Sequence, residues 1–191
     1  MRCMLCENLS FTQICKGCQK SFLTPTVYKR KILHNIEVLS FYKYTDIKKL
    51  LHTKHTDIGY HIYSILAKNS FKKFADSFGC DSRVASIAID DHVESGYSHT
   101  AILNKALRCN SICPYFNKLR AKNRVSYSGK TKEFRLLHPR EFSHNSFKEK
   151  ELILVDDIVT TGLTLTQAVN SMKNYGKSTI FCLTLADAGL K

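Results

Sequence analysis

Four of the eight cysteines lie within the first 18 residues, in two pairs with the spacing of metal ligands. Cys3 and Cys6 form one pair, and Cys15 and Cys18 form the other. Two residues between the members of a pair let both sulfurs reach one metal ion, and four thiolates complete the tetrahedral site that zinc prefers. The spacing predicts one structural zinc ion in residues 1–20, which we call the cysteine knuckle. An iron–sulfur cluster and four free thiols are the alternatives.

The predicted zinc ion would supply folding energy, because a segment of about 20 residues buries too little apolar surface by itself. Gly17, inside the second pair, is expected to give the turn between two ligands its backbone freedom. The other four cysteines have no paired spacing and are expected to be core or incidental residues. The spacing leaves open whether the knuckle contacts nucleic acid or only braces the fold.

Residues 152–164 form a second segment that could bind a ligand. It begins with four aliphatic residues that predict a buried strand. Asp156 and Asp157 follow at the carboxyl end, where parallel sheets bind their ligands. The next turn combines hydroxyl groups, a glycine and the start of a helix, which together suit a phosphate. Its residues are Val159, Thr160, Thr161, Gly162, Leu163 and Thr164. Because the two acids would repel phosphate, they are expected to face sugar hydroxyls, magnesium or both; a purely structural turn is the alternative.

Length and composition are those of an ordinary globular protein: 191 residues, 43% hydrophobic and 24% charged. These values exclude intrinsic disorder and collagen-like repetition. The longest aliphatic run, residues 152–155, is far shorter than the roughly 20 residues that span a bilayer. The N-terminus has no apolar stretch with a cleavage site, so we expect a cytoplasmic protein without a signal peptide or membrane insertion.

The net charge is strongly positive, because 29 basic residues against 16 acidic ones give +13. Residues 118–150 hold 10 basic and 3 acidic residues, which is +7 of that total. Such a charge favours polyanions, and this basic segment is expected to be a long functional loop that contacts single-stranded DNA; an ordinary solvated excursion is the alternative. The candidate DNA contacts are Lys122, Arg124, Lys130 and Lys132, interleaved with the candidate stacking residues Tyr127, Phe134, Phe142 and Phe147.

The apolar pattern predicts strands that alternate with helices. Strands are expected at 36–41, 85–89, 112–116, 152–155 and 178–185, and helices at 47–51, 58–74, 100–107, 140–147 and 164–175. Residues 21–33, which include Lys29-Arg30-Lys31, are expected to be a connector. The alternation implies an α/β fold with a mostly parallel sheet flanked by helices. We expect a zinc-finger domain with a basic linker at 1–33 and a second domain at 34–191.

Residues 152–164 resemble the phosphoribosyl pyrophosphate signature of type I phosphoribosyltransferases, with its hydrophobic strand, acidic pair and Thr-Thr-Gly-x-Thr turn. The resemblance implies that Asp156 and Asp157 contact the ribose hydroxyls, with magnesium nearby. It also implies that residues 160–164 bind the 5-phosphate. Phosphoribosyl pyrophosphate is therefore the expected ligand.

Three features together resemble the ComF family over essentially the whole chain: the cysteine knuckle, Tyr42-Lys43-Tyr44 leading into residues 47–51, and the C-terminal signature. The resemblance implies the type I phosphoribosyltransferase fold with a small zinc domain. It also implies a role in natural competence, with single-stranded DNA and other competence or recombination proteins as partners.

The ComF resemblance is uneven after the strand expected at 85–89. The family there has an Arg-Gly-Phe-Asn-Gln-like stretch, and this chain has Ser95-Gly96-Tyr97-Ser98-His99. This region is the expected pyrophosphate loop, to which we assign Asp90, Asp91 and His92. No catalytic base is assigned, since the acceptor is unidentified. The expected function is ligand and DNA binding in competence; an active phosphoribosyltransferase of nucleotide metabolism or salvage is the alternative.

Overall fold

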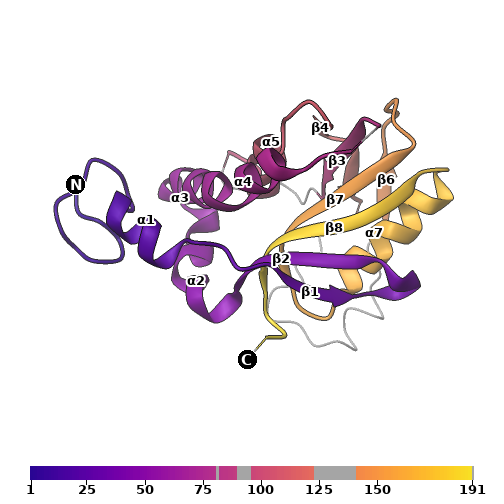
Figure 1. Ribbon diagram of the computed structural model, residues 1–191. Coiled ribbons are helices and arrows are strands. Elements are labelled where there is room, and N and C mark those ends of the chain that lie inside the picture. Colours follow the sequence, from indigo (N-terminus) through magenta and orange to yellow (C-terminus); the bar gives the residue numbers. More distant parts are fainter. Residues whose placement is uncertain (81, 90–95, 123–140, 191) are drawn as a thin grey trace.

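The computed structural model describes residues 1–80, 82–89, 96–122 and 141–190. Within these residues, a six-stranded sheet runs in the order β1-β2-β8-β7-β3-β4 (Figure 1). The strands are β1 (Tyr28–Lys31), β2 (Glu37–Lys43), β3 (Val84–Ala88), β4 (Ile112–Tyr115), β7 (Glu151–Val159) and β8 (Ser178–Asp187). β1 is antiparallel to β2, and every other pairing is parallel. The parallel strands therefore end at one common edge, and this confirms the predicted α/β architecture.

Helices cover both faces of the sheet, and two apolar cores separate the layers. The helices on one face are α2 (Tyr44–Leu51), η2 (His52–His55), α3 (Asp57–Ala67), the π-helical turn η3 (Lys68–Lys72), α4 (Lys73–Ser77) and α5 (His99–Ala106). The opposite face is covered by α7 (Leu163–Asn174) and by a small antiparallel sheet of β5 (Leu119–Ala121) and β6 (Phe142–His144). The expected helices at 47–51, 58–74, 100–107 and 164–175 are confirmed, because their apolar periodicity matches these buried faces.

β7 is the central element of the site, and it is longer than the expected strand at 152–155. Residues 152–155 are fully buried, as expected for a parallel strand covered on both faces. The ladder with β8 continues past them, so that Asp156 pairs with Thr184 and Val159 pairs with Asp187. The two acids therefore lie within the strand and not in the turn after it.

Two local expectations are wrong. The helix expected at 140–147 is replaced by β6, whose residue Phe142 pairs with Ala121 and is buried. The connector expected at 21–33 contains β1, with Arg30 paired to Val38 at the edge of the main sheet. β6 pairs with β5 on the other side of residues 123–140, whereas β1 pairs with the next strand, β2. Edge strands tolerate the charged residues that suggested a linker.

The cysteine knuckle lies at one end of the molecule, next to the helical layer (Figure 1). It joins that layer through helix α1 (Lys16–Phe22) and through the buried side chains of Ile14 and Leu23. Gln19 of α1 also accepts a hydrogen bond from Asn69 of η3, at 3.1 Å. Among the described helices, none combines the length and apolar character needed to cross a membrane.

Candidate functional site

The two adjacent acids of β7 have different surroundings. Successive residues of a strand point to opposite faces of the sheet. Asp157 therefore points, like the preceding Val155, toward the helical layer of α3 and α5, and Asp156 points toward the α7 face. Asp157 is buried and Asp156 is half-buried. One Asp156 carboxylate oxygen, Oδ1, accepts a hydrogen bond from the backbone N–H of Asp157 at 2.8 Å.

Asp157 meets two basic side chains of the helical layer. Lys54 of η2 places its Nζ 3.2 Å from Asp157 Oδ2, and His99 of α5 places its Nε2 3.3 Å from the same oxygen. Burial alone would raise the pKa of Asp157, but the charges and hydrogen bonds of Lys54 and His99 outweigh it and hold this pKa well below its ordinary range. Asp157 is therefore an ionised, paired carboxylate.

Two tyrosines complete the surroundings of this pair. Tyr97 donates a hydrogen bond to the backbone carbonyl of Lys54 at 2.8 Å and lies 3.1 Å from that of Thr56. Tyr63 is fully buried, and its ring meets the His99 ring edge-on at 5.5 Å. Burial, and after it the nearby charge of Asp157, raises the pKa of Tyr63 well above its ordinary value. We name Lys54, Tyr63, His99 and Asp157 the Asp157 cluster.

The turn after β7 has the geometry of an anion site at a helix N-terminus. Gly162 caps α7 with φ +78°, a left-handed conformation that favours glycine. A Cβ atom there would also lie 2.8 Å from Ile32 Cγ2. Thr160 and Thr161 are exposed, Leu163 and Thr164 are half-buried, and Val159 belongs to the core. Val159 therefore contributes through its backbone, and Thr161 Oγ1 accepts from the N–H of Leu163 at 3.4 Å.

Arg30 braces this turn from the edge strand β1. Its guanidinium donates to the backbone carbonyl of Thr160 at 2.9 Å and pairs with Asp187 Oδ1 at 3.1 Å. Asp187, at the end of β8, also accepts from the N–H of Gly189 at 2.7 Å. Four residues of this region were not predicted from the sequence: Arg30, Lys54, Tyr63 and Asp187. Only the basic run at 29–31 hinted at the first of them.

Magnesium fits the donor types at the carboxyl edge. It prefers oxygen ligands and is commonly held by one or two carboxylates together with phosphates of the substrate. The half-buried carboxylate of Asp156 is such a donor. Asp157 already faces Lys54 and His99, so its Oδ2 atom is engaged by protein groups. A magnesium ion bound with a phosphorylated ligand is consistent with this arrangement.

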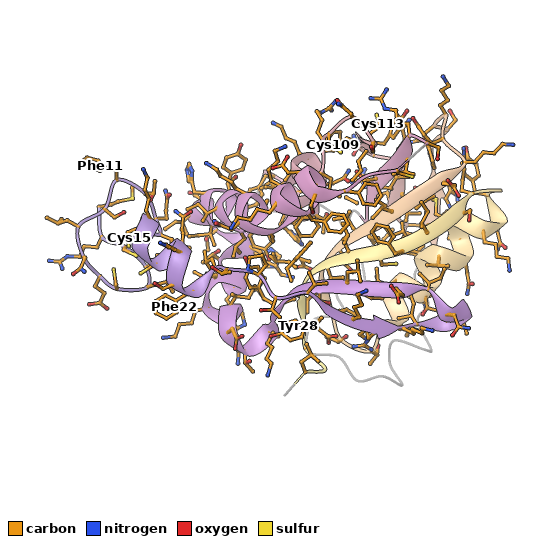
Figure 2. All side chains as sticks on the ribbon, in the orientation of Figure 1. Phe11, Cys15, Phe22, Tyr28, Cys109 and Cys113 are labelled. Carbon is orange, nitrogen blue, oxygen red and sulfur yellow. The ribbon has the colours of Figure 1, made fainter. Side chains whose placement is uncertain are left out.

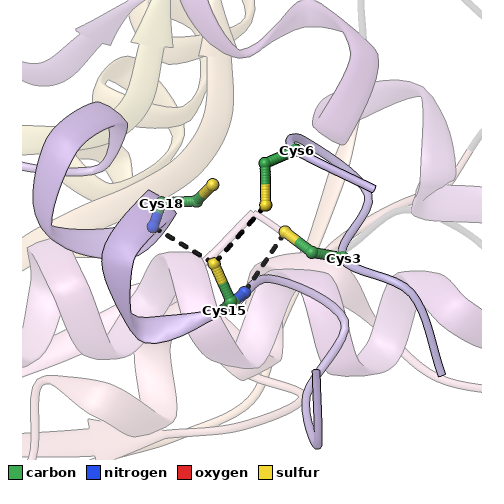
Figure 3. A group of neighbouring side chains, drawn as sticks. All are labelled: Cys3, Cys6, Cys15 and Cys18. Atoms are coloured by element: carbon green, nitrogen blue, oxygen red, sulfur yellow. Dashed lines mark hydrogen bonds between the residues drawn. The ribbon is translucent and has the colours of Figure 1, made fainter. Parts of the chain in front are cut away.

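The four N-terminal cysteines come together as their spacing predicts. The sulfur atoms of Cys3, Cys6, Cys15 and Cys18 all lie within 4.8 Å of one another (Figure 3). Cys6 Sγ and Cys15 Sγ are 3.8 Å apart. A tetrahedral zinc ion with Zn–S distances of about 2.3 Å separates its sulfurs by about 3.8 Å, so the cluster fits zinc.

Backbone N–H groups point at the sulfurs, as in metal knuckles. Cys3 Sγ accepts from the N–H of Cys15 at 3.3 Å, and Cys15 Sγ accepts from that of Cys18 at 3.4 Å. Burial alone would raise the pKa of Cys3, but such donors lower it to about 6. Burial and the neighbouring thiols raise the pKa of Cys18 to about 12. The cluster therefore needs a bound cation to hold all four sulfurs as thiolates.

The role expected for Gly17 is wrong. Gly17 lies within α1 and is not among the residues with positive φ. The turn between Cys15 and Cys18 is the first turn of this helix, capped by the Cys15 sulfur. An ordinary helical backbone therefore connects the two ligands.

Most of the expected DNA contacts and the expected pyrophosphate-loop residues lie outside the described residues. These are Arg124, Lys130, Lys132, Tyr127, Phe134, Asp90, Asp91 and His92. Lys122 is exposed, and its Nζ atom lies 3.6 Å from Glu141 Oε2. Phe142 is buried, and Phe147 packs against Tyr115 and beneath the Lys177 ammonium. Phe142 is therefore a core residue, and Phe147 is half-buried against the same core.

Comparison with known families gives one match, and it covers the signature. The phosphoribosyl transferase domain model matches residues 119–191, a segment that includes β5, β6, β7, α7 and β8. Among curated proteins, none matches the chain.

Solved structures to which parts of the chain are similar include three phosphoribosyltransferases. The hypoxanthine enzyme of Staphylococcus aureus is 12% identical with a TM-score of 0.43, over 65% of this chain and 62% of that one. The hypoxanthine enzyme of Trypanosoma cruzi is 18% identical with a TM-score of 0.41, over 65% and 64%. The match therefore spans less than two thirds of either hypoxanthine enzyme. Orotate phosphoribosyltransferase of Aeropyrum pernix is 14% identical with a TM-score of 0.42, over 91% and 81%.

The domain match and the site geometry concern the same part of the chain. Residues 119–191 contain the strand that carries Asp156 and Asp157 and the turn at Gly162. The surrounding sheet and helices have the expected α/β arrangement. The matched domain is the one on which this site is built, so residues 119–191 are similar to a phosphoribosyl transferase domain.

Proposed function

We propose that this protein binds phosphoribosyl pyrophosphate together with magnesium at the carboxyl edge of its sheet. The observation that carries the proposal is the strand–turn–helix unit at 151–174, which joins Asp156 to an open helix N-terminus within the matched domain. The first backbone N–H groups of α7 lack partners within the helix and carry a partial positive charge. A phosphate is the natural ligand of such a turn.

The three parts of the ligand have separate positions in this proposal. The 5-phosphate binds at residues 160–164, where Gly162 allows close approach and the threonines offer hydroxyl groups. The ribose lies over the ends of the strands, near Asp156. The pyrophosphate points toward the segment between β3 and α5, and magnesium joins it to the Asp156 carboxylate.

Replacing Asp156 by asparagine is expected to weaken binding of magnesium phosphoribosyl pyrophosphate by about 10- to 100-fold. The substitution removes one negative charge from the sugar and the metal, and hydrogen bonds to charged groups contribute about 1.5–3 kcal/mol. Isothermal titration calorimetry measures the affinity. Asp76→Asn is the matched control, because Asp76 is an exposed carboxylate of α4 that pairs with Lys72. Equal affinities in the Asp156 variant and the wild type would contradict the proposal.

Catalytic turnover, measured separately from ligand binding, distinguishes a salvage enzyme from a protein with the competence role. A transferase releases pyrophosphate when an acceptor attacks the anomeric carbon. Pyrophosphate release should therefore be measured with a panel of bases and with DNA acceptors. Release with one base would favour the alternative of nucleotide salvage, whereas binding without release favours the competence role.

We also propose that the protein handles single-stranded DNA in natural competence. Two features support this: the net charge of +13, and exposed aromatic side chains beside basic ones at the knuckle. Phe11 and Phe22 point outward into solvent (Figure 2), and α1 carries Lys16 and Lys20 between them in sequence. Exposed aromatic rings next to basic residues are typical surfaces for stacking unpaired bases.

Binding of single-stranded DNA is expected to fall log-linearly with salt, by about 0.7 per neutralised phosphate, because counterions are released. Fluorescence anisotropy of a labelled oligonucleotide measures this slope. Lys130→Glu with Lys132→Glu should flatten it. Lys72→Glu with Lys73→Glu is the charge-matched control in the helical layer. Absence of binding at tens of micromolar protein and physiological salt would refute the DNA role, because non-specific affinities lie at about 10⁻⁴–10⁻⁶ M.

A further inference from the structure

The Asp157 carboxylate is enclosed by protein groups. Its side chain is 10% exposed, and its Oδ2 atom lies 3.2 Å from Lys54 Nζ and 3.3 Å from His99 Nε2. Those two partners are themselves only 24% and 16% exposed. A buried carboxylate with two close basic partners is stable in that position, whereas loss of one partner leaves an uncompensated charge.

The backbone of Lys54 is also held in position. Tyr97 donates to the Lys54 carbonyl, and Gly59 of α3 leaves room for the Tyr97 hydroxyl. His99 follows Tyr97 by two residues and contacts Asp157. The segment 97–99 therefore contacts the Lys54–Asp157 pair twice, through Tyr97 on the lysine backbone and through His99 on the carboxylate.

The hydroxyl of Tyr63 is a further polar group near Asp157. Its hydroxyl is fully buried and has no hydrogen-bond partner within the described part of the chain. The Tyr63 ring contacts His99, and the phenol is close enough to Asp157 to feel its charge. A buried hydroxyl without a partner is costly, and Asp157 is the acceptor toward which a small movement would turn it.

Asp156, the adjacent residue, lies on the other side of the strand. It points to the opposite face of the sheet and is half-buried. We propose that Asp157 is a positioning residue, anchored by Lys54 and His99, and that Asp156 presents the carboxylate that contacts the sugar and the metal. The second half of this inference rests on the proposed function. The first half concerns the protein alone.

Anchoring gives Asp157 two effects on the ligand site. It fixes the C-terminal end of the β7 backbone, because the backbone N–H of Asp157 also donates to the Asp156 carboxylate at 2.8 Å. It also links the segment before α5 to the same strand, since His99 lies at the start of that helix. The start of α5 is thereby held against the end of β7.

A thermal double-mutant cycle tests the anchor without any ligand. Asp157→Asn and Lys54→Met are each expected to lower the unfolding midpoint by about 5 °C or more. The double variant should lie no lower than the worse single variant, because the same pair is broken in each. Lys54→Arg should restore most of the loss, since it keeps the charge. Additive losses, or a midpoint that neither single variant changes, would overturn the anchor.

The exposed pair Lys72–Asp76 is the matched control for this cycle, with side chains 45% and 57% exposed. Lys72→Met and Asp76→Asn should shift the midpoint by no more than about 2 °C, because exposed ion pairs contribute little. If Asp157→Asn does not fold, Lys54→Met compared with Lys54→Arg gives the same comparison.

Titration of the same variants with phosphoribosyl pyrophosphate, with and without magnesium, separates the two acids. Asp156→Asn is expected to lose the magnesium dependence of binding at an unchanged midpoint. Asp157→Asn is expected to keep that dependence and to lose less than tenfold in affinity. The reverse assignment would overturn the inference. If the wild type binds no phosphoribosyl pyrophosphate, the proposed function fails, and the thermal cycle still decides whether Asp157 is anchored.

Discussion

Removal of zinc is expected to unfold the cysteine knuckle and to destabilise the helical layer beside it. Zinc-finger peptides bind the metal with apparent free energies of about 10–16 kcal/mol, and this energy is also their folding energy. In this chain, Cys3, Ile14, Cys18 and Leu23 are buried in the same core as the α2–α5 layer. Loss of the metal therefore exposes apolar surface on both sides of that contact.

Metal analysis and limited proteolysis measure this outcome. Purified protein should contain one zinc ion per chain, and Cys15→Ser should contain none and should be cleaved rapidly within residues 1–22. Cys80→Ser is the control, because Cys80 is exposed and lies outside the cluster. A wild type without zinc, or a Cys15 variant that keeps it, would refute the zinc site.

Gly59→Ala is expected to destabilise the protein strongly, although alanine normally stabilises a helix by about 1 kcal/mol relative to glycine. Gly59 is buried in α3, and a Cβ atom there would overlap the backbone carbonyl oxygen of Thr53 and the hydroxyl of Tyr97. Overpacking costs about 1–3 kcal/mol, occasionally more, and a backbone atom cannot rotate away as a side chain does. We expect the unfolding midpoint to fall by about 4–10 °C.

Differential scanning calorimetry of a matched pair tests this expectation. Gly17 is also helical, but the nearest atom to its Cβ position is Cys15 Sγ at 3.9 Å, an ordinary contact. Gly17→Ala should therefore leave the midpoint unchanged or raise it. A second change, Tyr97→Phe in the Gly59→Ala background, should recover part of the loss, because it removes the Tyr97 hydroxyl and leaves only the Thr53 backbone in the way. A Gly59 variant as stable as the wild type would contradict the packing of α3 against Tyr97.

The cysteine cluster and the strand–turn–helix unit could be predicted from the sequence because both are local. Two residues between Cys3 and Cys6 are enough to bring their sulfurs to one ion. Likewise, an aliphatic run followed by acids and a glycine-containing turn determines a buried strand and a helix start within 13 residues. The structure confirms that the four sulfurs cluster and that Gly162 caps α7 in the left-handed conformation.

β1 and β6 could not be predicted, because neither is stabilised by its own pattern. β6 exists through its pairing with β5, and β1 exists through its pairing with β2 at the sheet edge. Both are short and rich in polar residues. Without their partners, residues 28–31 and 142–144 have the composition of loops.

Residue type and short spacing were enough to identify the residues that could hold a metal or a phosphate. The difference between the two acids arises from the fold, because the partners of Asp157 come from far along the chain. Lys54 lies 103 residues before it, and Arg30 lies 130 residues before the Thr160 carbonyl that it braces. Strand order and helix packing create these contacts, and a strand exposes its neighbouring residues to opposite layers. The burial and charge around each acid are therefore properties of the fold.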